Sequence, residues 1–271
     1  MMRRLALVAV LATVLAACTP ASTPEPTPDL TAGLLQFSHD TARGRMVVQV
    51  RNDSSAPITP ASITYDDPRL GPPIPADGMR EIPAGSQRSF AVPLPTEPPC
   101  AGPVDAGGPT ATVRTVDVTV TLPVTDPTEI VARHLAERCL VLAAAEVAEL
   151  RWADRLRIEG ERAWLVLEVR PTGGSGRLRI GDVTGTHLFG PVGTATWRVR
   201  RTVHGSGRPF RVELPVAPAR CDGHAFAEGG NATAFRLRLS VGRRHGPVRL
   251  RMGERGATAA LNFGARRCGL R

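Results

Sequence analysis

The 271-residue sequence contains no lysine, and all 34 of its basic residues are arginine. This absence excludes a P-loop, a Schiff base to pyridoxal phosphate and a Ser-x-x-Lys nucleophile, because each of them requires a lysine amine. Aromatic residues are also scarce, at 4% of the chain against 42% hydrophobic residues, so we expect a core of aliphatic side chains. The length corresponds to one or two domains.

Long hydrophobic runs are missing as well. The run Leu5–Val14 is shorter than the roughly 20 residues that a transmembrane helix needs. It follows two arginines and precedes Leu-Ala-Ala-Cys at residues 15–18, which is the pattern of an export signal. These four residues resemble the bacterial lipobox, in which the cysteine is acylated and becomes the first mature residue. We therefore predict a lipoprotein signal peptide over residues 1–17 and lipidation of Cys18. An ordinary signal peptide that is cleaved elsewhere is the alternative.

Residues 18–31 form a proline-rich spacer, because four prolines fall between residues 20 and 28. Such a segment favours polyproline II and acts as a semi-rigid spacer. Two acyl chains on Cys18 would bury enough methylene groups for stable anchoring. We therefore expect an exported protein that is held on the outer face of the cytoplasmic membrane through its lipid. The two arginines leave twin-arginine export open, although the flanking residues favour general secretion.

The rest of the chain contains one unit twice. Phe90–Pro95 (FAVPLP) and Phe210–Pro215 (FRVELP) share the pattern F-x-V-x-L-P, and a C-x-G follows each of them, at Cys100 and at Cys221. Upstream, residues 46–51 (MVVQVR) match residues 165–170 (LVLEVR). The matches occur in one order, which predicts an internal repeat with a period of about 120 residues. Coincidence in a chain rich in Ala, Gly and Pro is the alternative.

Apolar and polar residues alternate in several short segments, namely 116–122, 178–180, 210–214 and 235–241. A period of two places one set of side chains on each face of a strand, so these strands bury one side. The pattern predicts a mainly β fold with two tandem antiparallel immunoglobulin-like β-sandwich domains, residues 32–144 and 145–271. One short helix is expected near residues 127–138, where Asp126 can cap it and Pro127 occupies its first position.

The cysteines support the repeat. With Cys18 lipidated, four cysteines remain, and export implies an oxidising compartment in which they pair. Four cysteines allow three pairings. The repeat favours Cys100–Cys139 and Cys221–Cys268, which gives one disulfide to each unit.

The side chains best suited to catalysis or metal binding lie close together near Cys221, which precedes His224 and Glu228. The alternative to a disulfide there is a metal site, or a cysteine nucleophile with a histidine base. No H-E-x-x-H and no G-x-S-x-G motif occurs in the sequence. We therefore predict no enzyme activity, no catalytic residue, no cofactor and no metal, and keep an envelope enzyme or metal-binding protein that uses the Cys221/His224/Glu228 region as the alternative.

The segment Arg220–Glu228 (RCDGHAFAE) resembles the R-C-D-x-H-A-x-A-E segment of uncharacterised actinobacterial lipoproteins and secreted proteins. In those proteins the segment lies in the second half and precedes a strand. The familiar form continues with a charged turn, whereas this sequence has Gly229, Gly230 and Asn231. The resemblance implies an exported location and tandem β units.

Charge is divided unevenly along the chain. Residues 1–150 contain 11 arginines and 16 acidic residues, a net charge of −5, and residues 151–271 contain 23 arginines and 9 acidic residues, a net charge of +14. Four of the later arginines, Arg236, Arg238, Arg249 and Arg251, fall on expected outward strand positions and are candidates for binding a polyanion. The alternative is an ordinary solvated polar face, on which arginine is frequent only because of the codon bias of a GC-rich genome.

Together these features predict a lipid-anchored envelope protein with a non-enzymatic binding or scaffolding role. Its expected partners are the membrane, through the anchor, and either an anionic envelope polymer or an acidic protein. Nucleic acid is not an expected partner, because the protein is exported and its basic strands carry no interleaved aromatic residues.

Overall fold

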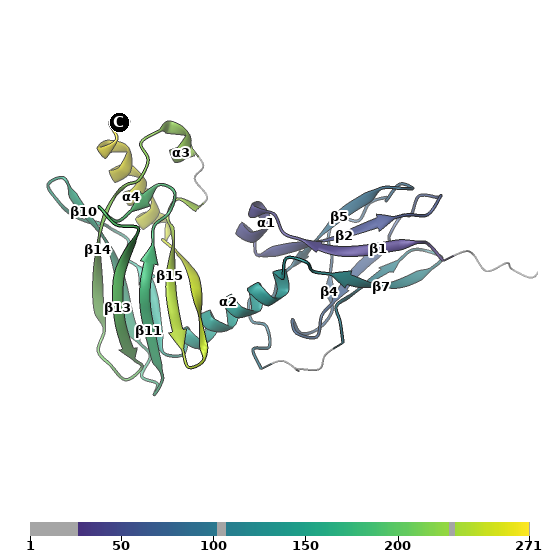
Figure 1. The fold of residues 1–271 in the computed structure, drawn as a ribbon, viewed down its shortest axis with the longest axis horizontal. Coiled ribbons are helices and arrows are strands. Elements are labelled where there is room, and N and C mark those ends of the chain that lie inside the picture. The colour runs from purple at the N-terminus through teal and green to yellow at the C-terminus, as the bar shows by residue number, and fades with distance from the viewer. Residues whose placement is uncertain (1–26, 102–106, 228–230, 271) are drawn as a thin grey trace, which may run out of the picture.

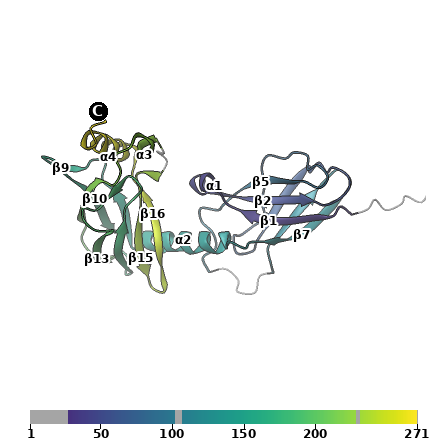
Figure 2. The same ribbon diagram turned by 45° about the horizontal axis from the view of Figure 1, so that its top comes forward.

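The computed structural model describes residues 27–101, 107–227 and 231–270, and in them the fold is mainly β with several sheets. Two groups of strands lie side by side along the long axis of the molecule, and one helix joins them (Figures 1 and 2). Each group has its own hydrophobic cluster, one drawn from residues 30–131 and the other from residues 140–263. Cys18 and the rest of the predicted signal peptide lie outside the described residues.

The first group contains seven strands and a short helix among the described residues. They are β1 (Leu30–Leu35), α1 (Ser38–Ala42), β2 (Arg45–Asn52), β3 (Ser62–Asp66), β4 (Ile74–Pro75), β5 (Gln87–Pro93), β6 (Thr110–Arg114) and β7 (Thr119–Thr125). The strand order is β4-β3-β6-β7-β1-β2-β5. Tyr65, Phe90 and Met46 are fully buried between these strands, so even the only tyrosine of the chain belongs to the core.

Strands β1 and β7 pair in parallel, through Ala32 with Val124 and Gly33 with Thr125, while the other strand pairs are antiparallel. The expectation of a purely antiparallel arrangement is therefore wrong at this one junction. A Cβ atom at Gly33 would lie 2.9 Å from Oγ1 of Thr125, so glycine permits this close approach. The alternating segment 116–122 also differs from expectation, because the chain turns at residues 115–118 and β7 begins at Thr119.

The second group contains nine strands and two helices among the described residues. They are β8 (Ala148–Trp152), β9 (Arg157–Glu159), β10 (Arg162–Pro171), β11 (Arg177–Thr184), β12 (Phe189–Gly190), β13 (Thr196–His204), β14 (Phe210–Pro218), α3 (Gly223–Ala227), β15 (Ala234–Val241), β16 (Arg244–Arg251) and α4 (Glu254–Arg267). One sheet has the order β12-β14-β10-β8, with β9 beside β10, and the other has the order β13-β11-β15-β16. Trp152 and Trp197 both pack edge-on against Phe235 in the cluster of this group.

The two groups repeat one strand order. The order β4-β3-β6-β7 in the first group corresponds to β13-β11-β15-β16 in the second, and β1-β2-β5 corresponds to β8-β10-β14. The F-x-V-x-L-P segments lie at equivalent places, in β5 and in β14. A helix and a disulfide follow in both groups, which agrees with the internal repeat seen in the sequence.

Helix α2 (Ile130–Ala145) begins three residues later and ends seven residues later than the helix expected at residues 127–138. Asp126 does cap it, since its carboxylate accepts the backbone N–H groups of Ile130 and Val131 at 2.9 and 3.1 Å. Glu129 adopts a left-handed conformation with φ of 53°, which separates Pro127 from the helix. The expectation of a single helix is also wrong, because α1, α3 and α4 occur too. The alternation used for strands does not detect short helices of polar or small residues.

Helix α2 contributes to both hydrophobic clusters. Ile130 and Val131 pack in the first cluster, and Leu140 and Ala144 pack in the second. In the described residues no helix combines the length and the apolar character needed to cross a membrane.

Both expected disulfides are present in the structure. Cys100 pairs with Cys139 of α2, and Cys221 pairs with Cys268 at the end of α4. Each disulfide therefore joins the segment after an F-x-V-x-L-P strand to the helix that ends the same repeat. Two disulfides in one chain indicate an oxidising, extracytoplasmic location.

We predict that replacing Cys100 and Cys139 together by serine lowers the free energy of unfolding by about 3–4 kcal/mol, because the cross-link closes a loop with a sequence separation of 39 residues. Urea denaturation under oxidising conditions measures the effect, and Cys221→Ser with Cys268→Ser should cost a similar amount. The single change Cys18→Ser is the control and should leave the urea midpoint unchanged. A loss below ~1 kcal/mol for either pair would contradict a stabilising cross-link.

Candidate polyanion-binding face

Strands β15 and β16 place their arginines on one side of a sheet. Leu237 and Leu239 of β15 and Val248 of β16 are buried, so the side chains between them point outward. The predicted residues Arg236, Arg238, Arg249 and Arg251 are all exposed. The structure therefore brings these four residues together on two neighbouring strands.

Two of these arginines are direct neighbours. Arg236 lies opposite Arg249 in the antiparallel ladder of β15 and β16. Like charges at opposed positions destabilise a sheet, by roughly 0.2–1 kcal/mol. Among the described residues no acidic side chain forms an ion pair with Arg236, Arg238 or Arg249. The two guanidinium groups are thus close together, and neither is paired with a carboxylate of the described residues.

Strand β11 extends the same face, which the sequence did not reveal. Arg179 lies opposite Ser240 of β15, and Arg177 is two residues earlier on the same side of β11. The alternation around Leu178 and Ile180 predicts that Arg177 and Arg179 point outward, but only the strand order shows that β11 lies beside β15. We call the exposed outer side of β11, β15 and β16, with its residues Arg177, Arg179, Arg236, Arg238, Arg249 and Arg251, the basic face.

Two acidic residues lie next to this face. Glu137 of α2 accepts the backbone N–H of Arg249 at 3.3 Å, at the β16 edge. Asp182 of β11 lies opposite Arg198 of β13, at a bulge where the registers of both neighbouring strands shift. Its neighbour Gly181 lies against the backbone of Arg238, because a Cβ atom there would be 3.2 Å from the Arg238 carbonyl oxygen. Asp182 is therefore on β11 at the level of Arg238, and Thr184 of β11 lies opposite Arg236.

Arg251, the last of the four predicted residues, has a polar neighbour. Its Nη2 atom donates a hydrogen bond to Oδ1 of Asn231 at 3.2 Å. This contact fixes its guanidinium at the end of β16. Arg251 therefore differs from Arg236, Arg238 and Arg249, because its guanidinium is hydrogen-bonded to a neighbouring side chain.

On the opposite sheet of the second group, arginines form ion pairs with a buried carboxylate. On β10, Glu168 is buried and lies between Arg151 of β8 and Arg211 of β14. Its Oε2 atom is 2.5 Å from Nη2 of Arg151, and its Oε1 atom accepts a hydrogen bond from Nη2 of Arg211 at 3.0 Å. Arg170 completes the group at 3.6 Å. Three arginines therefore share one carboxylate.

The charge of Glu168 is held in place by these neighbours. Burial alone would raise its pKa, but the charges of Arg151 and Arg211, together with their hydrogen bonds, outweigh burial and hold the pKa below its ordinary value. Nearby, Arg157 pairs with Glu159 and Glu213 and lies over the ring of Trp164. On this sheet arginine occurs with carboxylates, whereas on the basic face it does not.

The alternative region near Cys221 has a structural role. The sulfur of Cys221 is bonded to Cys268, so it is not a thiolate in this structure. Asp222 accepts the backbone N–H of Ala225 and the guanidinium of Arg220, which together hold the pKa of Asp222 below its ordinary value. These bonds shape the entry to α3. His224 is exposed, and Glu228 lies outside the described residues. No three histidine, cysteine or carboxylate side chains gather as a metal site in the part of the chain that is described.

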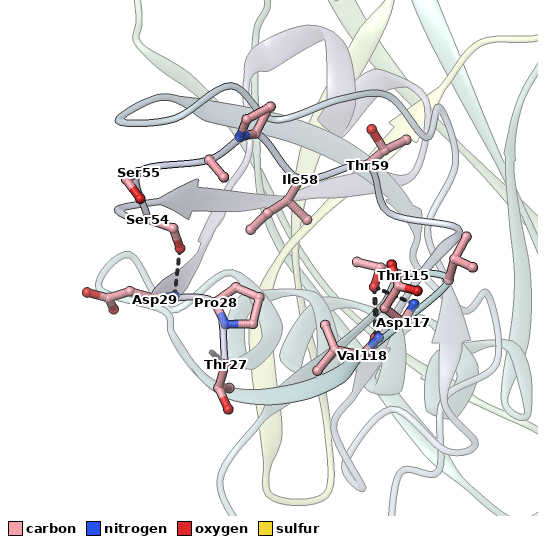
Figure 3. A pocket seen from close by; sticks show the side chains of 13 residues that line it. Thr27, Pro28, Asp29, Ser54, Ser55, Ile58, Thr59, Thr115, Asp117 and Val118 are labelled. Carbon is pink, nitrogen blue, oxygen red and sulfur yellow. Dashed lines mark hydrogen bonds between the residues drawn. The ribbon is translucent and has the colours of Figure 1, made fainter. Parts of the chain in front are cut away.

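A hollow of about 550 Å³ lies in the first group, at the end where β1 begins (Figure 3). Its lining comes from Thr27–Asp29, Ser54–Thr59 and Thr115–Val118. The backbone N–H of Asp29 donates to Oγ of Ser54 at 2.8 Å, and that of Val118 donates to Oγ1 of Thr115 at 3.0 Å. No histidine, cysteine or arginine lines it. Its lining offers neither an acid–base pair nor a cationic site, so the basic face is the stronger candidate.

Comparison with known proteins adds little. No family model matches the chain, and no curated protein matches it. Among solved structures, red sea bream transglutaminase is 11% identical with a TM-score of 0.21, over 83% of this chain and 31% of that protein, so this chain spans about a third of its length.

Two other solved structures are similar at the same level. The CBD12 structure from CALX1.2 is 10% identical with a TM-score of 0.20, over 75% of this chain and 77% of that one. The Pseudomonas aeruginosa CupB2 chaperone is 13% identical with a TM-score of 0.19, over 76% and 91%. Overlap this weak assigns neither a family nor a function.

We predict that Arg249→Thr raises the free energy of unfolding by about 0.2–1 kcal/mol at low salt, because it removes the like charge opposite Arg236. The gain should shrink in ~1 M salt, where screening shortens the reach of exposed charges to about 3 Å. Urea denaturation at the two salt concentrations measures it.

The matched control is Arg114→Thr, since Arg114 faces Thr119 and Ser62 across its strands. A gain of equal size in the control, or a gain that salt leaves unchanged, would show that threonine itself and not charge relief stabilises the strand.

Proposed function

We propose that this chain is an exported, lipid-anchored protein of the cell envelope whose second domain binds an anionic envelope polymer. The single observation that carries the proposal is the basic face, on which neighbouring arginines lie without acidic partners among the described residues. The role is one of binding or scaffolding and involves no catalysis. An envelope enzyme or a metal-binding protein that uses the region of Cys221, His224 and Glu228 remains the alternative.

The domain organisation that we propose is two tandem antiparallel immunoglobulin-like β-sandwich domains, residues 32–144 and 145–271. The repeated strand order and the two separate hydrophobic clusters support it. Helix α2 ends at Ala145, next to the proposed boundary. The first domain then lies between the anchor at Cys18 and the basic face.

A polymer fits the basic face better than an acidic protein does. Protein interfaces combine a polar rim with a desolvated, largely apolar centre. The outward positions of β15 hold Arg236, Arg238 and Ser240, so no apolar centre is present there. Nucleic-acid strands bind by stacking bases on aromatic rings, and the aromatic residues of this sheet, Trp197 and Phe235, are buried.

Composition alone does not explain the basic face. A codon bias that replaces lysine by arginine would change the arginine content of both sheets of the second domain in the same way. On β10 and its neighbours, however, arginines surround Glu168 and pair with Glu159 and Glu213. The difference between the two sheets supports a role for the uncompensated charge.

We predict that residues 30–271 co-sediment with a purified anionic wall polymer at low salt, and that the binding is lost in ~1 M salt. Replacing Arg236, Arg238, Arg249 and Arg179 by glutamine should weaken the binding at least tenfold, because several charge-assisted contacts disappear together.

The control removes four exposed arginines away from the basic face, with Arg114, Arg133, Arg155 and Arg162 changed to glutamine. It lowers the net charge equally and should retain most of the binding. The electrostatic proposal is wrong if the protein does not bind at low salt, or if binding is unchanged at ~1 M salt.

The anchor has its own test. We predict that Cys18→Ser moves the protein from the membrane fraction to the soluble fraction, because the sulfur carries the acyl chains. Inhibition of lipoprotein signal cleavage should leave the precursor uncut. If the Cys18→Ser protein stays in the membrane fraction after a high-salt wash, the anchor lies elsewhere.

A further inference from the structure

We propose that the basic face is an oblique track for one extended strand of a phosphodiester polymer that carries one negative charge every ~7 Å. The track runs from Arg249 and Arg236 through Arg238 to Arg179 and Arg177 across three strands. The inference rests on the proposed function and specifies its ligand.

The strand registers define the direction of the track. Arg236 lies opposite Arg249, Arg238 follows on the same side of β15, and Arg179 of β11 lies opposite Ser240, the next outward position of β15. The track therefore crosses from β16 to β15 between Arg249 and Arg236, follows β15 to Arg238, and then crosses to β11 one outward position further along, at Arg179. The five arginines form a diagonal line and not a compact ring, because β16 has Pro247 opposite Arg238 and His245 opposite Ser240.

The borders of the track favour this direction. On β11 the bulge places Gly181 and Asp182 opposite Arg238, and the Asp182 carboxylate would repel an anion that crossed straight from Arg238 to β11. On β16 the positions level with Arg238 and Ser240 carry no permanent charge.

The spacing of the track sets the charge spacing of the ligand. Neighbouring strands are about 4.8 Å apart, and two residues along a strand span about 6.8 Å. Steps along the track therefore measure roughly 5–8 Å. In an extended chain three single bonds span about 3.5 Å, so phosphorus atoms separated by six bonds, as in a poly(glycerol phosphate), are ~7 Å apart. One phosphate can then meet one guanidinium at each step.

Arginine also suits a phosphodiester chemically. Its planar guanidinium donates two parallel N–H bonds to two oxygens of one phosphate, which a lysine ammonium cannot do. The long side chains of Arg177, Arg179, Arg236, Arg238 and Arg249 are exposed, so each can adjust to a phosphate within its reach. A single bound phosphate would use one or two of them, whereas a chain uses all five.

The test uses poly(glycerol phosphate) oligomers of two, four, six and eight phosphates with the full chain in neutral detergent. Affinity should rise steeply up to about five phosphates and then level off. For a long oligomer, the slope of log K against log salt should be negative but less steep than the roughly −3.5 expected for five charges of a single nucleic-acid strand, because the charges of this polymer are further apart.

Single variants locate the track. Arg179→Gln and Arg177→Gln should each make the salt slope for the eight-phosphate oligomer less steep by about a fifth, since each removes one of five contacts. They should leave the weak binding of the two-phosphate oligomer to Arg236 and Arg249 unchanged. Arg236→Gln should weaken both. Arg162→Gln is the control and should change neither, because Arg162 lies on β10 of the other sheet.

The outcomes separate the track from the proposed function. Binding that does not depend on oligomer length, or that Arg177→Gln and Arg179→Gln affect no more than Arg162→Gln does, overturns the track while polymer binding by β15 and β16 survives. Absence of binding by every oligomer at low salt overturns the proposed function as well.

Discussion

Burial of alternate side chains on β11, β15 and β16 fixes the direction of every arginine between them. Leu178, Ile180, Leu237 and Leu239 are almost completely buried, and a shift of any strand by one residue would exchange them with arginines. The energy of the aliphatic core therefore holds the guanidinium groups outward. Packing of the aliphatic face of the sheet therefore keeps the opposite face positive along several strands, even though the arginines there repel one another.

This arrangement has an energetic cost that the opposite sheet avoids. Around Glu168, burial of a carboxylate is balanced by ion pairs with Arg151 and Arg211 across three strands, although Nε of Arg151 and Oε2 of Glu168 have no hydrogen-bond partner. Across β15 and β16 the like charges of Arg236 and Arg249 lie opposite one another, with no ion pair to a carboxylate of the described residues. The two sheets thus use the same residue type for internal ion pairs and for an outward row of unpaired charges.

Period-two patterns were sufficient to predict β15, β14 and β11, and the repeat was sufficient to choose the cysteine pairs. The cap at Asp126 was also predicted and is confirmed, but the left-handed Glu129, which delays the start of α2, leaves no mark in the side-chain pattern. The patterns failed again where the determining contact is distant in sequence. Arg236, Arg238 and Arg249 could be named from alternation alone, whereas Arg177 and Arg179 required the knowledge that β11 pairs with β15.

Helix α2 lies at the gap between β8 and β16 of the second group of strands. In the first group β1 and β7 pair directly, but β8 and β16 do not pair. Trp152 donates a hydrogen bond to the carbonyl of Leu250 across this gap, and Glu137 of α2 accepts the backbone N–H of Arg249. Arg244 in turn donates to the carbonyl of Cys100, beside the disulfide that holds the helix. Each domain thereby covers apolar surface of a helix that the other also needs. Unfolding of either one exposes Leu140 or Ile130 to water, so part of the stability of each domain belongs to its neighbour.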